Sequence, residues 1–254
     1  MQEAELSYPV GNRNHVPVSQ PPGCRPLAPS DYPVRDGNPM SETPIHWRAT
    51  VDATDPLHEF YRERSDVYVG SDMLMYYVEG DLRHSVVPDV WVAFGVPKLP
   101  ERRTWLIWLE GKGPDFVLEI TSRWTKREDE GRKKKLYEQL GVQEYWQFDP
   151  TGDYLDPVLK GRELGPDGKY RRLALQERDD VLRHASLLGL EICLREGRLF
   201  YFDPGRNVRL LTYLEQDSAR QAAEAERDRH LAARRAAEAR VAALERQLRE
   251  KSSE

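Results

Sequence analysis

The length, composition and charge of the chain exclude several classes of protein. Its 254 residues are 39% hydrophobic and 32% charged, and the formal net charge is -5. A chain of this length can bury one sizeable core with charged extensions around it. The net negative charge argues against a protein that coats nucleic acid by bulk electrostatics, so any contact with DNA needs a local basic patch.

Cysteine usage and hydropathy favour a soluble, cytoplasmic protein. Cys24 and Cys193 have no paired spacing, so neither a disulfide framework nor a thiolate zinc site is indicated. The first five residues lack the basic-then-apolar order of a secretion signal, and no run approaches the ~20 apolar residues of a membrane span. We therefore expect no export and no membrane partner.

The chain divides into three zones by composition. Residues 1–35 are rich in proline and small polar residues, which predicts a disordered tail. Short β-like runs broken by turn residues predict a globular domain over residues 36–212. Within it, the runs 66–69, 73–78 and 86–94 predict an antiparallel meander.

The middle of the domain predicts a parallel crossover. An apolar run at 116–121 is followed by a helical segment and then by a second apolar run at 145–148. Strand, helix and strand in that order are typical of parallel strands in a mixed sheet. Further β segments at 158–159 and 170–175 would extend or cap it. The expected fold class is therefore α/β, a mixed sheet flanked by helices.

Helical spacing in this crossover predicts which lysine of the run 132–135 faces the sheet. We expect it to begin at Thr125, in a capping box with Glu128, and to end at Gly141. At about 100° per residue one stripe contains Asp129, Lys133, Leu136, Tyr137 and Leu140. Lys133 should therefore face the sheet, whereas Lys134 and Lys135 point elsewhere. An i,i+4 ion pair between Lys133 and Asp129, worth ~0.3 kcal/mol on an exposed face, is the simpler interpretation, and both can hold.

Two acidic residues stand at or within predicted strands. Alternation in the run 116–121 places Phe116, Leu118 and Ile120 on one face and Glu119 on the other. A carboxylate inside such a run needs a metal, a cation or hydrogen bonds if it is buried, although an edge strand with Glu119 facing water is the alternative. Asp89 follows Pro88 at a strand entry, a pairing that is also common in turns.

Together these residues predict metal-dependent chemistry. Two carboxylates on adjacent strands supply hard oxygen ligands, which suit Mg²⁺ or Mn²⁺. A bound metal would polarise a phosphate and lower the pKa of a water, and Lys133 would stabilise the developing charge. Asp89, Glu119 and Lys133 are therefore the candidate catalytic residues.

Residues 213–254 contain no proline or glycine and are rich in Ala, Glu and Arg, which predicts a long helix. Val241, Leu244 and Leu248 fall at a/d spacing, but the preceding turns offer mostly alanine. We favour a solvated helix over a weak coiled coil that would make the protein a homodimer.

Three further positions have competing interpretations. His46 and His84 have no metal-ligand spacing, so we expect surface histidines. Trp124, near the cations Lys126, Arg127 and Arg132, could form a DNA-facing patch. A charged helix start is the commoner explanation of such a cluster.

The sequence resembles the PD-(D/E)XK nuclease superfamily, and more closely its Uma-two type of restriction endonucleases, over roughly residues 30–205. The matching stretches are 30–33, 36–43, 76–81, 87–90, 113–122, Asp129 with Lys133, and 136–150. The resemblance implies a mixed sheet flanked by helices, with Asp89, Glu119 and the Ile120 backbone carbonyl as metal ligands. It also makes Glu42 a supplementary ligand, although Glu42 beside the helix start Thr43-Pro44 is equally well a solvated side chain.

One position departs from the superfamily pattern. The superfamily has lysine two residues after the second acid, where this chain has Thr121. In this type of protein the helix supplies the lysine instead, here Lys133 with Tyr137 four residues later.

The expected function is a Mg²⁺- or Mn²⁺-dependent endonuclease that hydrolyses phosphodiester bonds of DNA. The alternatives are a catalytically inactive nuclease fold that acts through its C-terminal helix, and hydrolysis of another phosphoester. The sequence has no Gly-rich phosphate loop and no nucleophile elbow, which disfavours nucleotide-driven and acyl-transfer enzymes.

Overall fold

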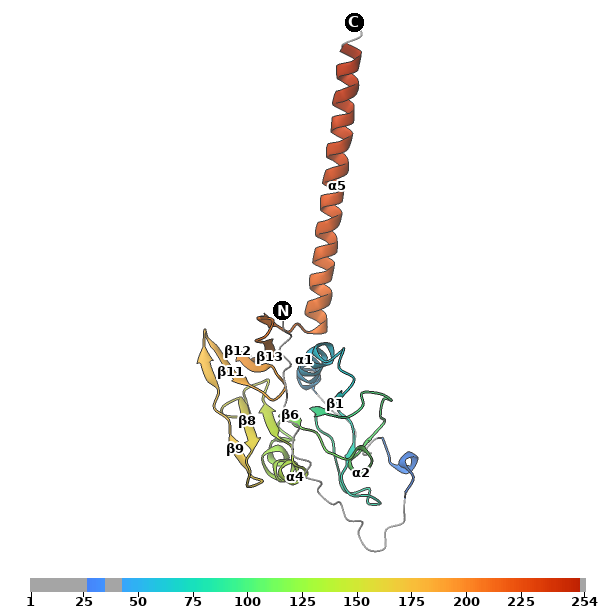
Figure 1. The fold of residues 1–254 in the computed structure, drawn as a ribbon. Helices are drawn as coiled ribbons and strands as arrows, with labels where there is room; N and C mark the ends of the chain where they lie inside the picture. The colour runs from blue at the N-terminus through green and yellow to red at the C-terminus, as the bar shows by residue number, and fades with distance from the viewer. Residues whose placement is uncertain (1–26, 35–42, 252–254) are drawn as a thin grey trace, which may run out of the picture. The chain divides into compact units, whose positions relative to one another are not determined.

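A computed structural model describes residues 27–34 and 43–251 of the chain (Figure 1). The chain divides into two compact units, Met1–Leu210 and Leu211–Glu254. Within the described ranges, no helix combines the length and apolar character needed to cross a bilayer.

A mixed six-stranded sheet forms the centre of the first unit, as predicted. Its strand order is β1-β4-β6-β7-β8-β9. β6 and β7 pair in parallel, and every other neighbouring pair in this sheet is antiparallel. The strands are β1 (Val67–Ser71), β4 (Val90–Phe94), β6 (Phe116–Ile120), β7 (Glu144–Phe148), β8 (Leu159–Leu164) and β9 (Tyr170–Arg172).

The parallel crossover between β6 and β7 is confirmed. It consists of α3 (Lys126–Glu128), the π-helical turn η2 (Asp129–Lys133) and α4 (Lys134–Leu140). α4 ends at Gly141 as predicted, where a φ of 74° favours glycine. The helical start differs from the prediction, because Thr125 makes no side-chain cap. The helical turn opens earlier, since the amide of Lys126 already donates to the Ser122 carbonyl at 3.1 Å.

The predicted meander is wrong, because the run 86–94 is not one strand and the runs 66–69 and 73–78 lie in different sheets. The run 86–94 splits into β3 (Ser85–Val86) and β4, and β3 joins β2 (Met75–Tyr76) and β5 (Trp105–Leu106) in a separate three-stranded sheet. Pro88 lies in the break, and without an N–H it cannot continue a hydrogen-bonded ladder. The break leaves Asp89 at the entry of β4. A short helix, α2 (Ile107–Glu110), follows β5.

Helix α1 (Pro44–Phe60) covers one face of the central sheet. Thr43 caps it by accepting a hydrogen bond from the amide of His46 at 3.2 Å, and Pro44 occupies the first turn. Ala53 and Leu57 pack in one cluster with the Phe116, Leu118 and Ile120 face of β6. Figure 1 shows β6 between α1 and α4.

The opposite face of β6 meets the crossover helix. Val117 packs in a second cluster with Leu136 and Tyr137 of α4 and with Tyr145 of β7. The alternation predicted for β6 is therefore confirmed, and Glu119 lies on the side of α4 rather than that of α1.

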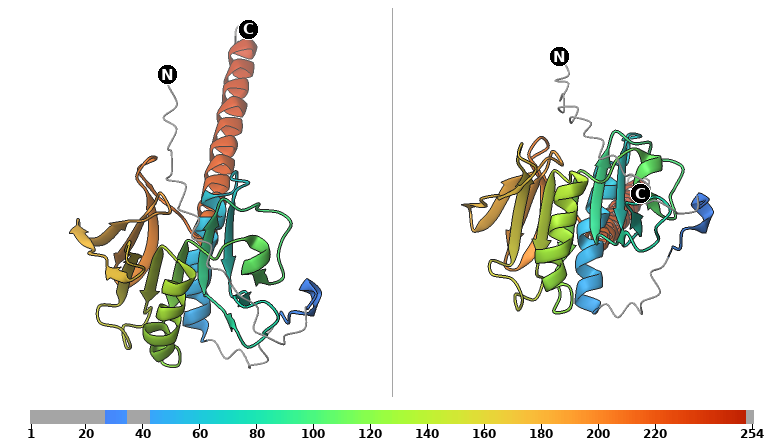
Figure 2. Two further views of the ribbon diagram at one scale, coloured as in Figure 1. Left: turned by 60° about the horizontal axis from the view of Figure 1, so that its bottom comes forward. Right: turned by 90° about the horizontal axis from the view of Figure 1, so that it is seen from below.

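A second, five-stranded antiparallel sheet completes the unit. Its strands are β10 (Gln176–Arg178), β11 (Val181–Ala185), β12 (Glu191–Arg195), β13 (Arg198–Asp203) and β14 (Val208–Arg209). Leu190, Ile192 and Tyr201 share a core cluster with β6 and α1. Figure 2 shows this sheet, in yellow and orange, beside the central sheet.

Part of the expected tail belongs to the folded unit. Residues 27–34 contain a short 3-10 helix, η1 (Pro29–Asp31), and Tyr32 is only 4% exposed. The ring of Tyr32 contacts the rings of Tyr76 and Trp108. The rest of the predicted tail, including Cys24, lies outside the described residues.

The predicted C-terminal helix is present as α5 (Tyr213–Lys251). Thr212 and Glu215 form a capping box, in which each side chain accepts from the amide of the other residue, at 3.4 and 3.0 Å. Ion pairs such as that between Arg234 and Glu238, at 2.8 Å, run along its surface. The coiled coil and the homodimer remain predictions.

Two buried tryptophans each cover a glycine on the neighbouring strand. Trp91 is paired with Gly70, and Trp146 with Gly161. A Cβ added at Gly161 would lie 2.6 Å from the Trp146 ring, and one at Gly70 would lie 2.3 Å from the Trp91 ring. These positions therefore require glycine because the indole occupies the space of a side chain.

Gly161→Ala should lower the free energy of unfolding by about 1–3 kcal/mol, because the fully buried Trp146 ring must move. Gly131→Ala is the matched control. It meets no atom within 4 Å and should be neutral or stabilise by about 0.5–1 kcal/mol. Urea denaturation of the three proteins measures the difference, and equal midpoints for Gly161→Ala and the wild type would contradict this packing.

Candidate functional site

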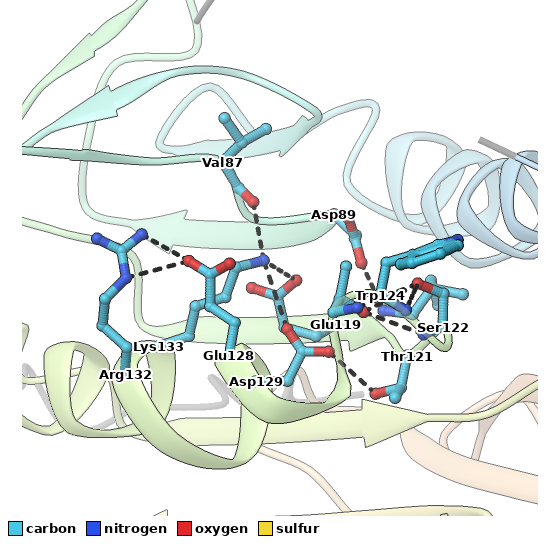
Figure 3. A network of polar contacts seen from close by, with 12 residues as sticks. Val87, Asp89, Glu119, Thr121, Ser122, Trp124, Glu128, Asp129, Arg132 and Lys133 are labelled. Atoms are coloured by element: carbon cyan, nitrogen blue, oxygen red, sulfur yellow. Dashed lines mark hydrogen bonds and ion pairs between the residues drawn. The ribbon is translucent and has the colours of Figure 1, made fainter. Parts of the chain in front are cut away.

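Glu119 is the centre of a buried polar cluster (Figure 3). Its side chain is 0% exposed, and both carboxylate oxygens are bonded. Oε2 accepts from Nζ of Lys133 at 2.8 Å, and Oε1 accepts from the Tyr137 hydroxyl at 2.5 Å. The alternative of a water-facing edge strand is therefore wrong, because β6 lies inside the sheet.

Lys133 connects three elements. Besides Glu119, its Nζ lies 3.6 Å from Oδ1 of Asp129 and 3.3 Å from the carbonyl oxygen of Val87. Both interpretations of this lysine hold, since it faces the sheet and also pairs with Asp129. Val87 lies in the break before β4, so its carbonyl is free of any strand ladder and can accept from the ammonium.

The π-helical turn sets the position of Lys133. Asp129 and Lys133 are its first and last residues, and both are buried. The Tyr145 hydroxyl donates to the Asp129 carbonyl oxygen at 2.8 Å, which anchors the turn to β7. Wider turns of this kind are frequent at functional sites.

Asp89 joins the cluster from β4. Its Oδ2 accepts from the amide of Ile120 at 2.6 Å, next to Glu119 in the chain. Burial by itself would raise the pKa of Asp89, but the bond to His46, the charge of Lys133 and the Ile120 amide outweigh burial and lower that pKa. Asp89 is thus held as a carboxylate.

The other two acids are perturbed in the opposite direction. Burial raises the pKa of Glu119 well above its usual value; Lys133 opposes this, and the charges of Asp89 and Asp129 add to it. Burial likewise raises the pKa of Asp129 to about 6, against the attraction of Lys133. Burial disfavours the charged form of Lys133 too, yet the attraction of Glu119, Asp89 and Asp129 prevails and raises its pKa.

The cluster carries more negative than positive charge. Asp89, Glu119 and Asp129 face the ammonium of Lys133, with the His46 imidazole beside Asp89, so ionisation of all three acids leaves two uncompensated negative charges while His46 is neutral. Oδ1 of Asp129 is buried and, within the described residues, receives no hydrogen bond. An excess of this size is what a divalent cation would neutralise, and carboxylate oxygens are the donors that Mg²⁺ and Mn²⁺ prefer.

The carboxylates of this cluster suit such a metal by their chemical type and charge. Their positions in this structure do not form a recognisable metal site. Among the residues that the structure describes, no three His, Cys, Asp or Glu side chains gather as a metal-binding group. Lys133 and Tyr137 each donate to one oxygen of Glu119. Each oxygen keeps a second lone pair, so a cation would coordinate Glu119 beside these bonds or in place of one of them.

The structure brings Asp89, Glu119 and Lys133 together. Ile120 contributes its amide to Asp89, whereas a metal-binding role for its carbonyl remains a prediction. Glu42 lies outside the described residues. Sequence reasoning did not single out Tyr145, which supports the site by donating to the backbone carbonyl of Asp129.

His46 was predicted to lie at the surface, and this is wrong. It is 7% exposed, and its Nε2 lies 3.6 Å from Oδ2 of Asp89. Its spacing with Thr50, Ala53 and Leu57, all buried on α1, was the signal that could have identified it. His84 is partly exposed, and its Nδ1 lies 3.0 Å from Oδ2 of Asp81.

The predicted capping box of the crossover helix is also wrong. Oγ of Ser122 accepts from the amides of Trp124 and Thr125, both at 3.3 Å, so the cap lies three residues earlier. Glu128 instead pairs with Arg132, at 2.5 Å, on the surface of the helix.

Comparison with known proteins places the chain in a family. A family model described as "Uma2: Putative restriction endonuclease" matches residues 29–195, a range that includes Asp89, Glu119 and Lys133. Among solved structures, the chain is similar to the crystal structure of a "putative nuclease belonging to DUF820" from Anabaena variabilis ATCC 29413. The identity is 15% and the TM-score 0.40, and the match covers 54% of this chain and 73% of that one. No curated protein matches significantly. Because the family model spans more than half of the chain, the chain belongs to the Uma2 family of restriction-endonuclease-like proteins.

Proposed function

We propose that this protein is a metal-dependent endonuclease that hydrolyses phosphodiester bonds of DNA. Family membership supports a nuclease in general. The observation that carries the finer proposal is the fully buried Glu119 bonded to Lys133, with Asp89 held as a carboxylate on the adjacent strand.

The proposed ligands of the metal are Asp89 and Glu119, with the Ile120 carbonyl as a third donor. A bound Mg²⁺ or Mn²⁺ would lower the pKa of a water and polarise the scissile phosphate. Placing the two acids on adjacent strands holds them in a fixed relation, since the Asp89 carboxylate is bonded to the amide next to Glu119.

The proposed role of Lys133 is to orient the attacking water and to stabilise negative charge on the phosphoryl oxygens. Its ammonium is restrained by Glu119, Asp129 and the Val87 carbonyl, so little reorganisation is needed during the reaction. Tyr137 is a positioning residue, because its hydroxyl fixes the second oxygen of Glu119.

Glu119→Gln and Asp89→Asn should each weaken Mn²⁺ binding at least about 10-fold, because each removes one charged donor. Glu130→Gln is the matched control, since Glu130 lies on the same crossover but pairs with Lys160 at the surface. Isothermal titration with Mn²⁺ gives the four affinities. Equal affinity in all four proteins would remove the metal site from Asp89 and Glu119.

Lys133→Ala should reduce nicking of supercoiled plasmid by roughly 100- to 1000-fold while Mn²⁺ affinity is largely kept, because the ammonium acts on the transition state. Lys135→Ala, an exposed lysine of the same run, should keep full activity. Since loss of Lys133 leaves the Glu119 carboxylate unpaired, circular dichroism must show that both variants are folded at the assay temperature. A wild-type protein that nicks no DNA with any divalent metal would favour the inactive nuclease fold instead.

Metal binding should raise the thermal midpoint more at about pH 8 than at about pH 5. The pKa of Asp129 is raised to about 6, so its contribution to stability is present below about pH 4 and is lost as the pH rises through 6. Mn²⁺ would offset that loss, which is roughly 1–3 kcal/mol. In Asp129→Asn the increase in thermal midpoint on adding Mn²⁺ should depend less on pH than it does in the wild type. Identical pH profiles in differential scanning fluorimetry would contradict the proposed charge excess.

A further inference from the structure

Trp124 is the most exposed large hydrophobic side chain in the described part of the chain. It is 80% exposed, whereas Trp91, Trp105 and Trp146 are each fully buried. Tryptophan normally buries most of its apolar area, so an indole left in water needs an explanation other than packing. A charged helix start accounts for the neighbouring cations but not for this ring.

The turn that carries Trp124 is well ordered by its own hydrogen bonds. Oγ of Ser122 accepts from the amides of Trp124 and Thr125, and the amide of Ser122 donates to Oγ1 of Thr125 at 3.0 Å. The indole is therefore presented to solvent by a tied turn rather than by a long loop, which lowers the entropy lost when a ligand binds to it.

This turn is also tethered to the candidate site. The turn follows Thr121, whose hydroxyl donates to Oδ2 of Asp129 at 3.3 Å (Figure 3). This bond joins the two ends of the segment 122–128 within the buried cluster. Trp124 lies five residues after Glu119, which limits their Cα separation to about 18 Å. An aromatic ring at this position is within a few nucleotides of a phosphate at Lys133.

The charge around Trp124 is opposite to that of the whole protein. Residues 123–127 contain Arg123, Lys126 and Arg127 and no acid, in a chain of net charge -5. The Arg123 guanidinium lies 5.6 Å from the Trp124 ring centre. Within the described residues none of the three cations is held in an ion pair, so all three can meet phosphates.

We propose that Trp124 is a stacking platform for an unpaired base of the DNA substrate, within a few nucleotides of the phosphate that is cut. This inference rests on the proposed nuclease function and names its substrate class, which is DNA with unpaired bases near the cleavage site. Stacking of bases on aromatic rings, combined with cations along the backbone, is how proteins hold single strands without reading their sequence. In a duplex the bases are already stacked on each other, so the Trp124 ring would add no stacking contact to the binding free energy.

The test separates bases from phosphates. Fluorescence anisotropy in EDTA, where no cleavage occurs, measures the affinity of the full-length protein for a labelled single strand and for a strand of equal length made of abasic sites. The wild type should bind the strand with bases about 5- to 100-fold more tightly than the abasic one. Trp124→Ala should abolish that preference, and Trp124→Phe should keep most of it.

Two controls assign the effect to stacking. Arg127→Ala should weaken binding to both strands by the same factor, because phosphate contacts do not depend on bases. Tyr213→Ala removes an aromatic ring that is 65% exposed at the beginning of α5 and should change neither affinity.

A Trp124→Ala protein that retains the preference for bases would overturn the stacking role while leaving the nuclease proposal intact. So would a wild type that binds both strands equally. A wild type that binds neither strand would also overturn the stacking role, whereas the nuclease proposal would still be decided by Mn²⁺ binding and plasmid nicking.

Discussion

The bond between the buried carboxylate of Glu119 and the ammonium of Lys133 is the constraint on which the site depends. An ionised group in a sheet interior is tolerated only if it is paired and hydrogen-bonded. Glu119 meets this requirement with Lys133 and Tyr137, one helical turn apart on the crossover. Losing one partner of such a pair costs about 3–5 kcal/mol, so the strand and the helix are held in one relative position.

Irregular backbone surrounds this bond on two sides. The chain breaks at Pro88 between two sheets, and the Val87 carbonyl that the break releases accepts from Lys133. On the other side, the π-helical turn carries Asp129 and Lys133, and Tyr145 and Thr121 bond to Asp129. Each irregular segment thus provides a backbone carbonyl, of Val87 or of Asp129, that accepts a hydrogen bond from a side chain of the site.

Side chains on β6 alternate between an apolar face that stabilises the fold and a face that carries the candidate catalytic residue Glu119. Phe116, Leu118 and Ile120 bury apolar area against α1 and the five-stranded sheet. The opposite face carries Glu119 toward α4, within a cluster that has more negative than positive charge. Burial of the apolar face stabilises the fold and offsets the destabilising repulsion among the carboxylates. A bound cation would reduce that repulsion.

The sequence alone determined the features that depend on local periodicity. A period of two assigned Glu119 to the face opposite Phe116 and Leu118, and about 100° per residue selected Lys133 over Lys135. Gly141 and Thr43-Pro44 marked helix ends because capping involves only near neighbours. Periodicity says which face a residue occupies, but not which element that face meets. Only the tertiary structure could therefore decide that His46 lies beside Asp89, that the run 86–94 divides between two sheets, and that Lys133 bonds to Glu119 rather than only to Asp129. Those contacts join residues far apart in the chain, and their partners are set by the packing of the whole domain.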